Sequence, residues 1–369
     1  MSIQRPSSRA LGLALACAAC GDTDPTSDPT QPARDPAPAV IFRDAALTAG
    51  LDFQHVSGAR GDFAMPEIMG GGVALLDADR DGRLDVYFVQ SGRLGDGPAS
   101  PGNQLFLNLG DLRFQDVSAA SGADHRGYGN GVAVGDADGD GHDDLYVTNV
   151  GPNALLLSRG EARFDDVSST SGTDHPGWGT SAAFADTDAD GDLDLFVVNY
   201  LDWSAEGELT CHNEQGLRDY CSPQAYESPA RDVLYRNDGE GGFRDVSEAS
   251  GIASVPGAGL GIGCGDFDLD GRLDIFVAND GMADALWQNQ GDGTFTDIAL
   301  LAGCAVDDSG RPKAGMGVAL GDVDDDGDLD LAVCNLAGQS DSFYINQGGW
   351  FRDQTAISGL ATASKSRTR

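Results

Sequence analysis

The stretch Asp77-Ala-Asp-Arg-Asp-Gly-Arg-Leu-Asp85 sets four aspartates and one glycine at fixed positions within nine residues. The same pattern, Asp-x-Asp-x-Asp-Gly-x-x-Asp, begins again at Asp136, Asp186, Asp266 and Asp322. Four carboxylates at this spacing suit one hard cation with oxygen ligands, and the glycine permits a sharp turn. Because the pattern occurs five times in 369 residues, it predicts a metal site and a repeated architecture together.

Calcium is the cation that these loops favour. We number each loop from its first aspartate, so that positions one, three, five and nine carry carboxylates and the backbone carbonyl at position seven adds an oxygen. The glutamate that an EF-hand places at position twelve is absent, and strand-like residues such as Val147 stand there. We therefore expect about five calcium sites with a structural role. The candidate ligand residues are Asp77, Asp79, Asp81, Arg83, Asp85, Asp136, Asp138, Asp140, His142, Asp144, Asp186, Asp188, Asp190, Asp192, Asp194, Asp266, Asp268, Asp270, Arg272, Asp274, Asp322, Asp324, Asp326, Asp328 and Asp330.

Short segments rich in Val, Leu, Ile and Phe flank every acidic loop. Gly72–Leu76 precedes the first loop and Val86–Val89 follows it, so the loop is predicted to be the turn of a β-hairpin. Two more strand segments complete each unit, as Gln104–Asn108 and Phe114–Ser118 do in the first. Four-stranded units that repeat at this scale predict an all-β protein, a β-propeller of four-stranded blades.

Five complete blades can be counted, and one strand of the fourth kind is left over at Ile41-Phe-Arg-Asp-Ala45. Such a strand completes the last blade of a propeller, so we expect an incomplete ring whose other strands lay in a missing C-terminal part. The alternative is a ring of five blades with an unpaired strand, which would leave an exposed edge. The predicted propeller covers residues 40–361, with an insertion at 199–231 and a tail at 362–369.

The composition excludes one class of partner. The formal net charge is −36, and aspartate outnumbers glutamate by 51 to 8. Nucleic-acid binding requires clustered Lys and Arg, so no nucleic-acid partner is expected. Aspartate is short and suits turns, which agrees with 52 glycines and with many tight connections between strands.

The N-terminus is similar to a bacterial export signal. Two arginines precede the apolar run Ala10–Ala19, which is too short to span a bilayer as a mature helix. We expect a signal peptide of the lipoprotein type over residues 1–20, lipidation at Cys20 and a disordered linker over residues 21–39. The protein would then lie at the bacterial cell surface or outer membrane, held only by its lipid; the alternative is plain secretion.

The insertion contains a candidate disulfide. Cys211 and Cys221 bracket a short polar loop, and export to an oxidising compartment favours a bond between them. The aromatic residues Trp203, Tyr220 and Tyr226 have two interpretations. They form either a surface for a partner or a cover that the disulfide pins and that packs on the propeller.

Beyond the acidic loops, four further motifs are distinctive: Met65–Gly72, Tyr220–Tyr226, Asn289–Phe295 and Ala314–Gly317. With them, residues 41–361 resemble FG-GAP/VCBS repeats, which are calcium-binding propeller repeats also found in integrin alpha subunits. The resemblance is closer to the bacterial cartilage-acidic-protein-like family, which often carries a C-terminal ASPIC/UnbV domain. It implies a seven-bladed, calcium-loaded propeller in exported proteins, usually without known enzymatic activity. The last blades and an ASPIC/UnbV segment are not found in this sequence.

The function expected from these observations is that of an interaction or adhesion module. Calcium would hold the hairpins, and loops on one face would bind an extracellular protein or a glycan. The alternative is a calcium-dependent, polysaccharide-active enzyme similar to lyases built on propellers. An enzyme needs convergent acid and base residues, and the sequence has no Ser-His-Asp or Cys-His arrangement that stands out, so an enzyme is not expected.

Overall fold

A computed structural model of the chain describes residues 42–239 and 241–365. Of the described residues, 45–239 and 241–365 belong to one compact unit, and 42–44 belong to a separate unit. Among the helices of the two described ranges, none combines the length and apolar composition that a membrane span requires. The predicted signal peptide, Cys20 and the linker lie outside the described residues.

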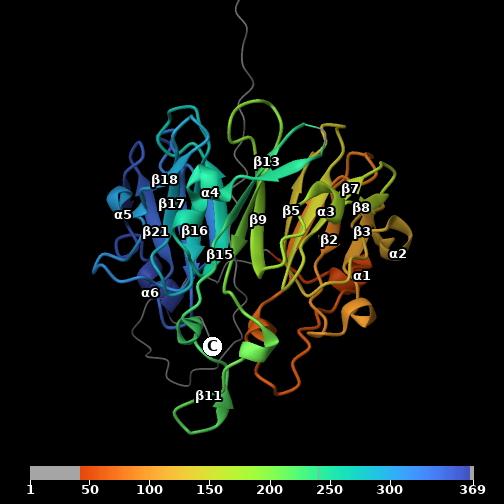
Figure 1. Ribbon diagram of the computed structural model, residues 1–369, viewed down its shortest axis with the longest axis horizontal. Helices are drawn as coiled ribbons and strands as arrows, with labels where there is room; N and C mark the ends of the chain where they lie inside the picture. The colour runs from red at the N-terminus through yellow and green to blue at the C-terminus, as the bar shows by residue number, and fades with distance from the viewer. Residues whose placement is uncertain (1–41, 240, 366–369) are drawn as a thin grey trace, which may run out of the picture. The chain divides into compact units, whose positions relative to one another are not determined.

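Within the described ranges, the strands form five four-stranded antiparallel sheets, the blades of a propeller, and one two-stranded sheet (Figure 1). In every blade the strands are hydrogen-bonded in chain order, from the inner strand to the outer one. Blade 1 contains β1 (Val73–Leu76), β2 (Asp85–Phe88), β3 (Gln104–Asn108) and β4 (Phe114–Asp116); blade 2 contains β5 (Gly129–Gly135), β6 (Asp144–Asn149), β7 (Ala154–Ser158) and β8 (Phe164–Asp166); blade 3 contains β9 (Gly179–Ala185), β10 (Asp194–Asn199), β13 (Val233–Asn237) and β14 (Phe243–Asp245); blade 4 contains β15 (Gly259–Gly265), β16 (Asp274–Asn279), β17 (Ala285–Asn289) and β18 (Phe295–Asp297); blade 5 contains β19 (Gly315–Gly321), β20 (Asp330–Asn335), β21 (Ser342–Asn346) and β22 (Phe351–Asp353).

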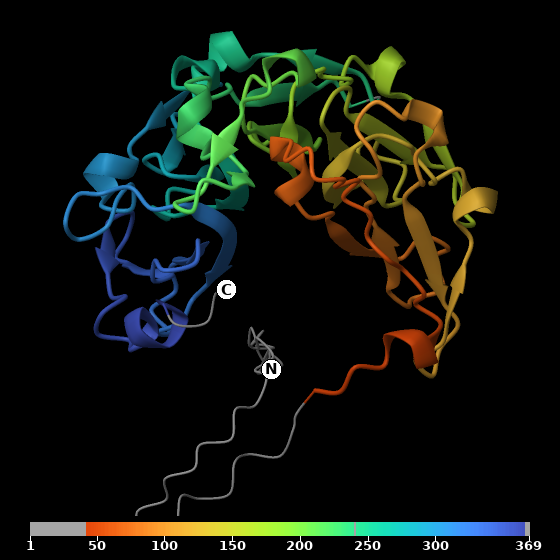
Figure 2. The ribbon, with the colours of Figure 1, turned by 90° about the horizontal axis from the view of Figure 1, so that it is seen from below.

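The hydrophobic core lies between the blades. The inner strands β1, β5, β9, β15 and β19 contact one another in that order, so successive blades stand face to face (Figure 2). Leu76 and Leu105 of blade 1, for example, pack against Leu145 and Leu156 of blade 2. Because blade 2 is covered on both faces, every residue of β6 is buried. This double burial explains why the second strands read as continuous apolar runs.

Glycine allows the inner strands to approach closely. A Cβ atom on Gly131 would lie 2.3 Å from the carbonyl oxygen of Thr180 in the next blade, and one on Gly261 would lie 2.0 Å from that of Met316. Either contact is shorter than a carbon and an oxygen can tolerate. The glycines that precede the acidic loops therefore set the spacing between blades.

Short helices after the fourth strands were not predicted. Asp116 Oδ1 accepts hydrogen bonds from the backbone N–H and the hydroxyl of Ser118, and Gly122 ends the turn with φ at 79°. Asp166 and Asp245 accept the same two bonds in blades 2 and 3, and Asp297 of blade 4 accepts the N–H of Ala299. These helices are α2 (Ser118–Ser121), α3 (Ser168–Ser171), α4 (Ser247–Ser250) and α5 (Ala299–Ala302), and the remaining short elements are α1 (Ala46–Ala49), α6 (Leu360–Lys365), η1 (Met65–Ile68), η2 (Gly97–Ala99), η3 (Ala205–Gly207), η4 (Pro223–Tyr226) and η5 (Ile252–Ser254).

The expected strand at Ile41–Ala45 is wrong over residues 42–45, and Ile41 lies outside the described residues. A segment becomes a strand only through backbone hydrogen bonds to a neighbouring strand, and residues 42–45 belong to none of the sheets. The short helix that follows a fourth strand is nevertheless present. Helix α1 follows directly and ends at Gly50, whose φ is 88°, as α2 ends at Gly122.

Candidate metal centre

Each acidic loop joins the inner strand of a blade to its second strand. The glycine at position six has a positive φ in all five loops, from 84° at Gly82 to 101° at Gly191. Position four is also left-handed, with φ at 61° for Arg80, Ala189, Leu269 and Asp325. Blade 2 places Gly139 at this position, with φ at 71°. Two left-handed residues curl the chain so tightly that the carboxylates at odd positions face one another.

The first carboxylate closes the curl. In every loop, one of its oxygens accepts the N–H of the position-six glycine, as Asp77 Oδ2 does from Gly82 at 2.9 Å. The position-five carboxylate accepts the N–H of position seven, as Asp140 does from His142 at 2.9 Å. The loop is thus held by its own aspartates, and positions one and five contribute differently to it.

The ninth aspartate fastens the loop to the sheet. Asp144 is fully buried; its Oδ2 accepts the N–H of Ala137 at 2.7 Å, and its Oδ1 accepts that of Ser158 at 2.6 Å. The other four loops repeat both bonds. Burial raises the pKa of Asp144 to about 7, although these backbone donors lower it. Position nine therefore anchors the hairpin and also presents a carboxylate to the loop.

Five groups of three carboxylates result, and within each group the closest oxygens lie within 4.8 Å of one another. Four groups combine positions one, three and nine, and the third combines positions one, three and five. They are Asp77, Asp79 and Asp85; Asp136, Asp138 and Asp144; Asp186, Asp188 and Asp190; Asp266, Asp268 and Asp274; and Asp322, Asp324 and Asp330. Each group could hold a metal ion.

The third loop differs because of Arg236. Its Nη1 pairs with Asp188, and its Nε lies 3.3 Å from Asp194 Oδ2. The hydroxyl of Thr187 also bonds Asp194. These contacts draw the position-nine carboxylate of this loop away from the group. A guanidinium so close to the third group competes with any cation there.

The side chains at position seven bond to partners outside the groups of three carboxylates. Two of them, Arg83 and Arg272, also pair with the position-five carboxylates Asp81 and Asp270. Arg83 Nε donates to the carbonyl of Asn108 at 2.7 Å, and Arg272 Nε donates to that of Asn289 at 2.9 Å. Asp328 accepts the N–H of Gly348. These partners belong to the turn after the third strand of the same blade. The side chains at position seven therefore brace that turn, so any bond from this position to a cation comes from the backbone carbonyl.

Two position-one oxygens test whether a cation fits. Asp136 Oδ1 and Asp186 Oδ1 are buried and accept no hydrogen bond. A buried carboxylate oxygen without a donor is costly unless a cation compensates it. The donor set of carboxylate oxygens is the one that hard divalent cations prefer. The chemistry of these loops therefore fits a bound divalent cation.

An asparagine at the end of the third strand ties the loops of blades 2, 3 and 4 to the next blade, a role that the sequence did not reveal. Asn289, at the end of β17, donates from Nδ2 to the carbonyl of Thr187, at position two of the preceding blade's loop, at 2.7 Å. Asn237 and Asn346 make the same bond to the loops of blades 2 and 4. Because the partner lies in another blade, sequence patterns within one unit could not reveal it. The acidic loops are therefore linked in series.

The insertion packs on the propeller as a cover. Cys211 and Cys221 are joined by a disulfide, with an S–S distance of 2.10 Å. Glu208 accepts hydrogen bonds from the indole of Trp203, the hydroxyl of Tyr226 and the backbone N–H of Met65. The hydrophobic residues around Trp203 and Tyr226 form a cluster with the buried Trp178 and Tyr200. These two aromatic side chains are therefore engaged within the fold and do not form a free surface.

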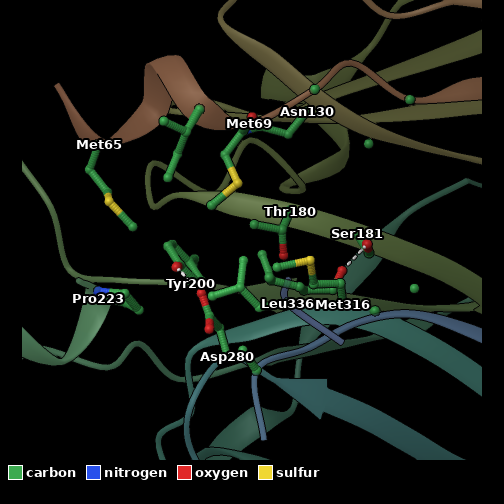
Figure 3. A pocket seen from close by; sticks show the side chains of 18 of the residues that line it. Met65, Met69, Asn130, Thr180, Ser181, Tyr200, Pro223, Asp280, Met316 and Leu336 are labelled. Atoms are coloured by element: carbon green, nitrogen blue, oxygen red, sulfur yellow. Dashed lines mark hydrogen bonds between the residues drawn. The ribbon is translucent and has the colours of Figure 1, made fainter. Parts of the chain in front are cut away.

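A second candidate site lies at the other ends of the inner strands. Residues near the N-terminal ends of all five inner strands line a cavity of 1290 Å³, here called the axial pocket (Figure 3). The acidic loops follow the C-terminal ends of the same strands. Met65, Met69, Tyr200, Asp280 and Met316 also line the pocket. Three of the four distinctive motifs of the sequence, Met65–Gly72, Tyr220–Tyr226 and Ala314–Gly317, contribute to its walls. The sequence could not show that they meet, because they lie far apart in the chain.

The repeats that carry the acidic loops match a known family. A sequence profile of the FG-GAP-like repeat matches residues 77–147, 136–197, 213–277 and 266–333. The chain belongs to the FG-GAP-like repeat family. Each matched FG-GAP-like segment ends within the second strand of a blade and contains at least one acidic loop.

The chain is also homologous to cartilage acidic protein 1. The protein of Xenopus tropicalis is 28% identical over 278 residues, which are 72% of this chain and 39% of that protein. The Mus musculus protein is 28% identical over 283 residues, 74% of this chain and 41% of the protein, and the Homo sapiens protein is 26% identical over 286 residues, 74% and 40%. The FG-GAP-like chain thus spans about two fifths of the length of these relatives.

Three solved structures resemble the chain more distantly. A lectin of Agrocybe aegerita that recognises non-reducing terminal N-acetylglucosamine has a TM-score of 0.37 at 16% identity, over 83% of this chain and 86% of the lectin. The V. cholerae biofilm matrix protein Bap1 has 0.40 at 14%, over 77% and 38%. The exotype rhamnogalacturonan lyase YesX has 0.41 at 15%, over 76% and 48%.

Proposed function

We propose that this chain is an exported calcium-binding propeller that serves as a binding module for an extracellular protein or glycan. The observation that carries the proposal is the fivefold recurrence of three carboxylates within 4.8 Å at the same place in every blade. A turn needs at most one such side chain. Gathering three in register, five times, costs electrostatic free energy that only a bound cation returns.

Calcium suits these loops better than magnesium. Calcium accepts six to eight oxygen ligands, including backbone carbonyls, whereas magnesium keeps several waters and uses one or two carboxylates. Three carboxylates with a carbonyl at position seven supply most of a calcium shell. In this arrangement the cation would offset the negative charge of the loop, and the chain's own hydrogen bonds would hold the loop in place.

The residues around each site show how bound calcium would stiffen the propeller. The position-nine aspartate joins the loop to the third strand of its own blade, as Asp274 does through Asn289 N–H at 2.8 Å. The side chain of the same Asn289 holds the loop of the preceding blade. A rigid loop therefore fixes two blades, and the binding surfaces that the blades carry are fixed with them.

Export is supported by the disulfide between Cys211 and Cys221, since such bonds persist in oxidising compartments. The predicted signal peptide and Cys20 agree with a place at the bacterial cell surface, and secretion without a lipid remains the alternative. Mass spectrometry of the mature N-terminus distinguishes the two, because a diacylglycerol on Cys20 adds a defined mass.

Thermal unfolding of protein stripped by EDTA tests the calcium proposal. One site occupied at a hundredfold excess over its Kd stabilises the folded state by about 2.7 kcal/mol, so five sites should raise Tm by more than about 10 °C. Magnesium should raise it much less. Equal Tm values with and without calcium would refute the proposal.

Loop five offers a matched pair of variants. Asp324 belongs to a carboxylate group, and its neighbour Asp325 does not. Asp324→Asn should reduce the calcium-induced rise in Tm, and Asp325→Asn should leave it unchanged. A screen of extracellular proteins and glycans with the calcium-loaded chain then tests the binding role. Turnover of a polysaccharide in that screen would favour the enzyme alternative.

A further inference from the structure

The axial pocket combines apolar walls with one negative charge. Ile68, Val73 and Leu336 line it, although they are 49%, 59% and 49% exposed. Three methionines from two segments, Met65 and Met69 of one and Met316 of the other, surround the same space (Figure 3). Apolar side chains gathered in an open concavity mark a binding site, and methionine adapts to varied apolar partners.

Among the residues that the structure describes, Asp280 is the only one that lines the pocket with a formal charge. Its Oδ2 accepts the hydroxyl of Tyr200 at 2.7 Å, and the carboxylate keeps further acceptor capacity toward the pocket. Burial raises the pKa of Asp280, although the bond from Tyr200 lowers it. Because no Lys, Arg or His lines the pocket, a cation from elsewhere would find an unopposed carboxylate there.

Several polar side chains in the walls donate hydrogen bonds within the fold. Thr180 donates to the carbonyl of Gly259 at 2.8 Å, Ser181 donates to that of Leu260, and Gln224 donates to that of Asp280 at 2.8 Å. Asn130 donates to Gly179, and its Oδ1 is buried without a partner. A sugar needs several free donors and acceptors, so these walls favour apolar groups and a single donor over a glycan.

We propose that the axial pocket binds a polypeptide segment that carries apolar side chains and one basic side chain, with the basic group paired to Asp280. This inference rests on the proposed binding function and specifies its site and partner chemistry. The apolar residues of the segment lie against Met69, Met316 and Leu336. A basic partner also complements the acidic chain, whose formal net charge is −36.

Fluorescence polarisation with defined peptides tests the proposal. The probes are labelled nonapeptides of alternating leucine and serine with lysine, norleucine or glutamate at the centre, and a lysine peptide whose leucines are all serine. The first lysine peptide should bind at least tenfold more tightly than the other three. Asp280→Asn, which keeps an acceptor for Tyr200, should reduce its affinity to that of the norleucine peptide. Asp308→Asn, the same change on an exposed loop, should have no effect.

Oxidation by hydrogen peroxide locates the bound peptide. The lysine peptide should slow oxidation of Met69 and Met316, which line the pocket, and should not protect Met282, which does not. Failure of the lysine peptide to bind saturably, equal affinity for wild type and Asp280→Asn, or equal protection of all three methionines would overturn the inference. If calcium still raises Tm in that case, and a different partner binds regardless of Asp280→Asn, the inference fails and the proposed function stands.

Discussion

The substitution Asp232→Asn should destabilise the chain at low pH and stabilise it at high pH. Asp232 precedes β13 and is only 7% exposed. Its Oδ1 accepts the backbone N–H of Asn199 at 2.9 Å, and burial raises its pKa from 3.8 to about 7. The folded state favours the protonated acid. The stability that Asp232 contributes is therefore fully present below about pH 4 and is lost as the pH rises through about 7. The amide of the variant carries no charge at any pH, so its contribution to stability does not change with pH.

The magnitude follows from the two pKa values. A rise from 3.8 to about 7 corresponds to about 4 kcal/mol in total, of which about 2.5 kcal/mol falls between pH 5 and pH 8. The new amide also costs about 1–3 kcal/mol at every pH, because its N–H₂ lacks an acceptor. In blade 1 the equivalent Asn103 donates to the hydroxyl of Tyr87 at 2.9 Å, whereas blade 3 has Phe196 at that place.

Thermal unfolding in saturating calcium measures the difference between variant and wild type at each pH. The difference should move by about 2.5 kcal/mol, or about 5 °C in Tm, in favour of the variant from pH 5 to pH 8. The double variant Phe196→Tyr, Asp232→Asn supplies the missing acceptor and should be more stable than the single variant at both pH values. A difference that stays constant with pH would refute the assigned ionisation of Asp232.

Three further predictions concern the backbone of the acidic loops, the link between blades and the insertion. Ala189→Gly should stabilise the chain by about 1 kcal/mol, because φ is 61° there, and Gly139→Ala should destabilise it similarly; Tm values that shift in the same direction would contradict the assigned backbone. Asn289→Ala removes bonds of 2.7 and 3.2 Å from a residue that is 1% exposed, so it should cost about 2–4 kcal/mol and speed amide exchange around Thr187 in the other blade. Asn108→Ala, which loses the bonds to Leu84 and from Gly110 within its own blade, is its control, and unchanged exchange at Thr187 would exclude a link between blades. Replacing Cys211 and Cys221 by serine should cost about 2.5 kcal/mol for a separation of 10 residues, and limited proteolysis should then cut the insertion while the blades stay intact.

Local patterns were sufficient to predict the blades. The segments Gly72–Leu76 and Val86–Val89 contain β1 and most of β2, because alternation and turn composition act within one hairpin. The helix at Ser118–Ser121 was missed because four residues are too short to show a helical period. Its signal was Asp116 and Ser118, two residues apart, with Gly122 four residues later.

Tertiary contacts account for what the sequence could not show. The pattern treats the four aspartates of a loop alike, yet the fold buries Asp144 and leaves Asp140 exposed. Arg236 enters the third loop from another strand, and Asn289 reaches into another blade. Asp280 becomes part of a site only because the inner strands bring distant segments together. None of these contacts corresponds to a fixed spacing between residues in the sequence.

Counting the calcium ions bound per chain tests the central claim most directly. Protein stripped of metal is dialysed to equilibrium against millimolar calcium with excess magnesium, and its calcium is measured by elemental mass spectrometry. Each of the five carboxylate groups should hold one ion, with the third filling last because Arg236 competes there. We predict five calcium ions per chain. A content of one or none, or replacement of the calcium by magnesium, would contradict the account.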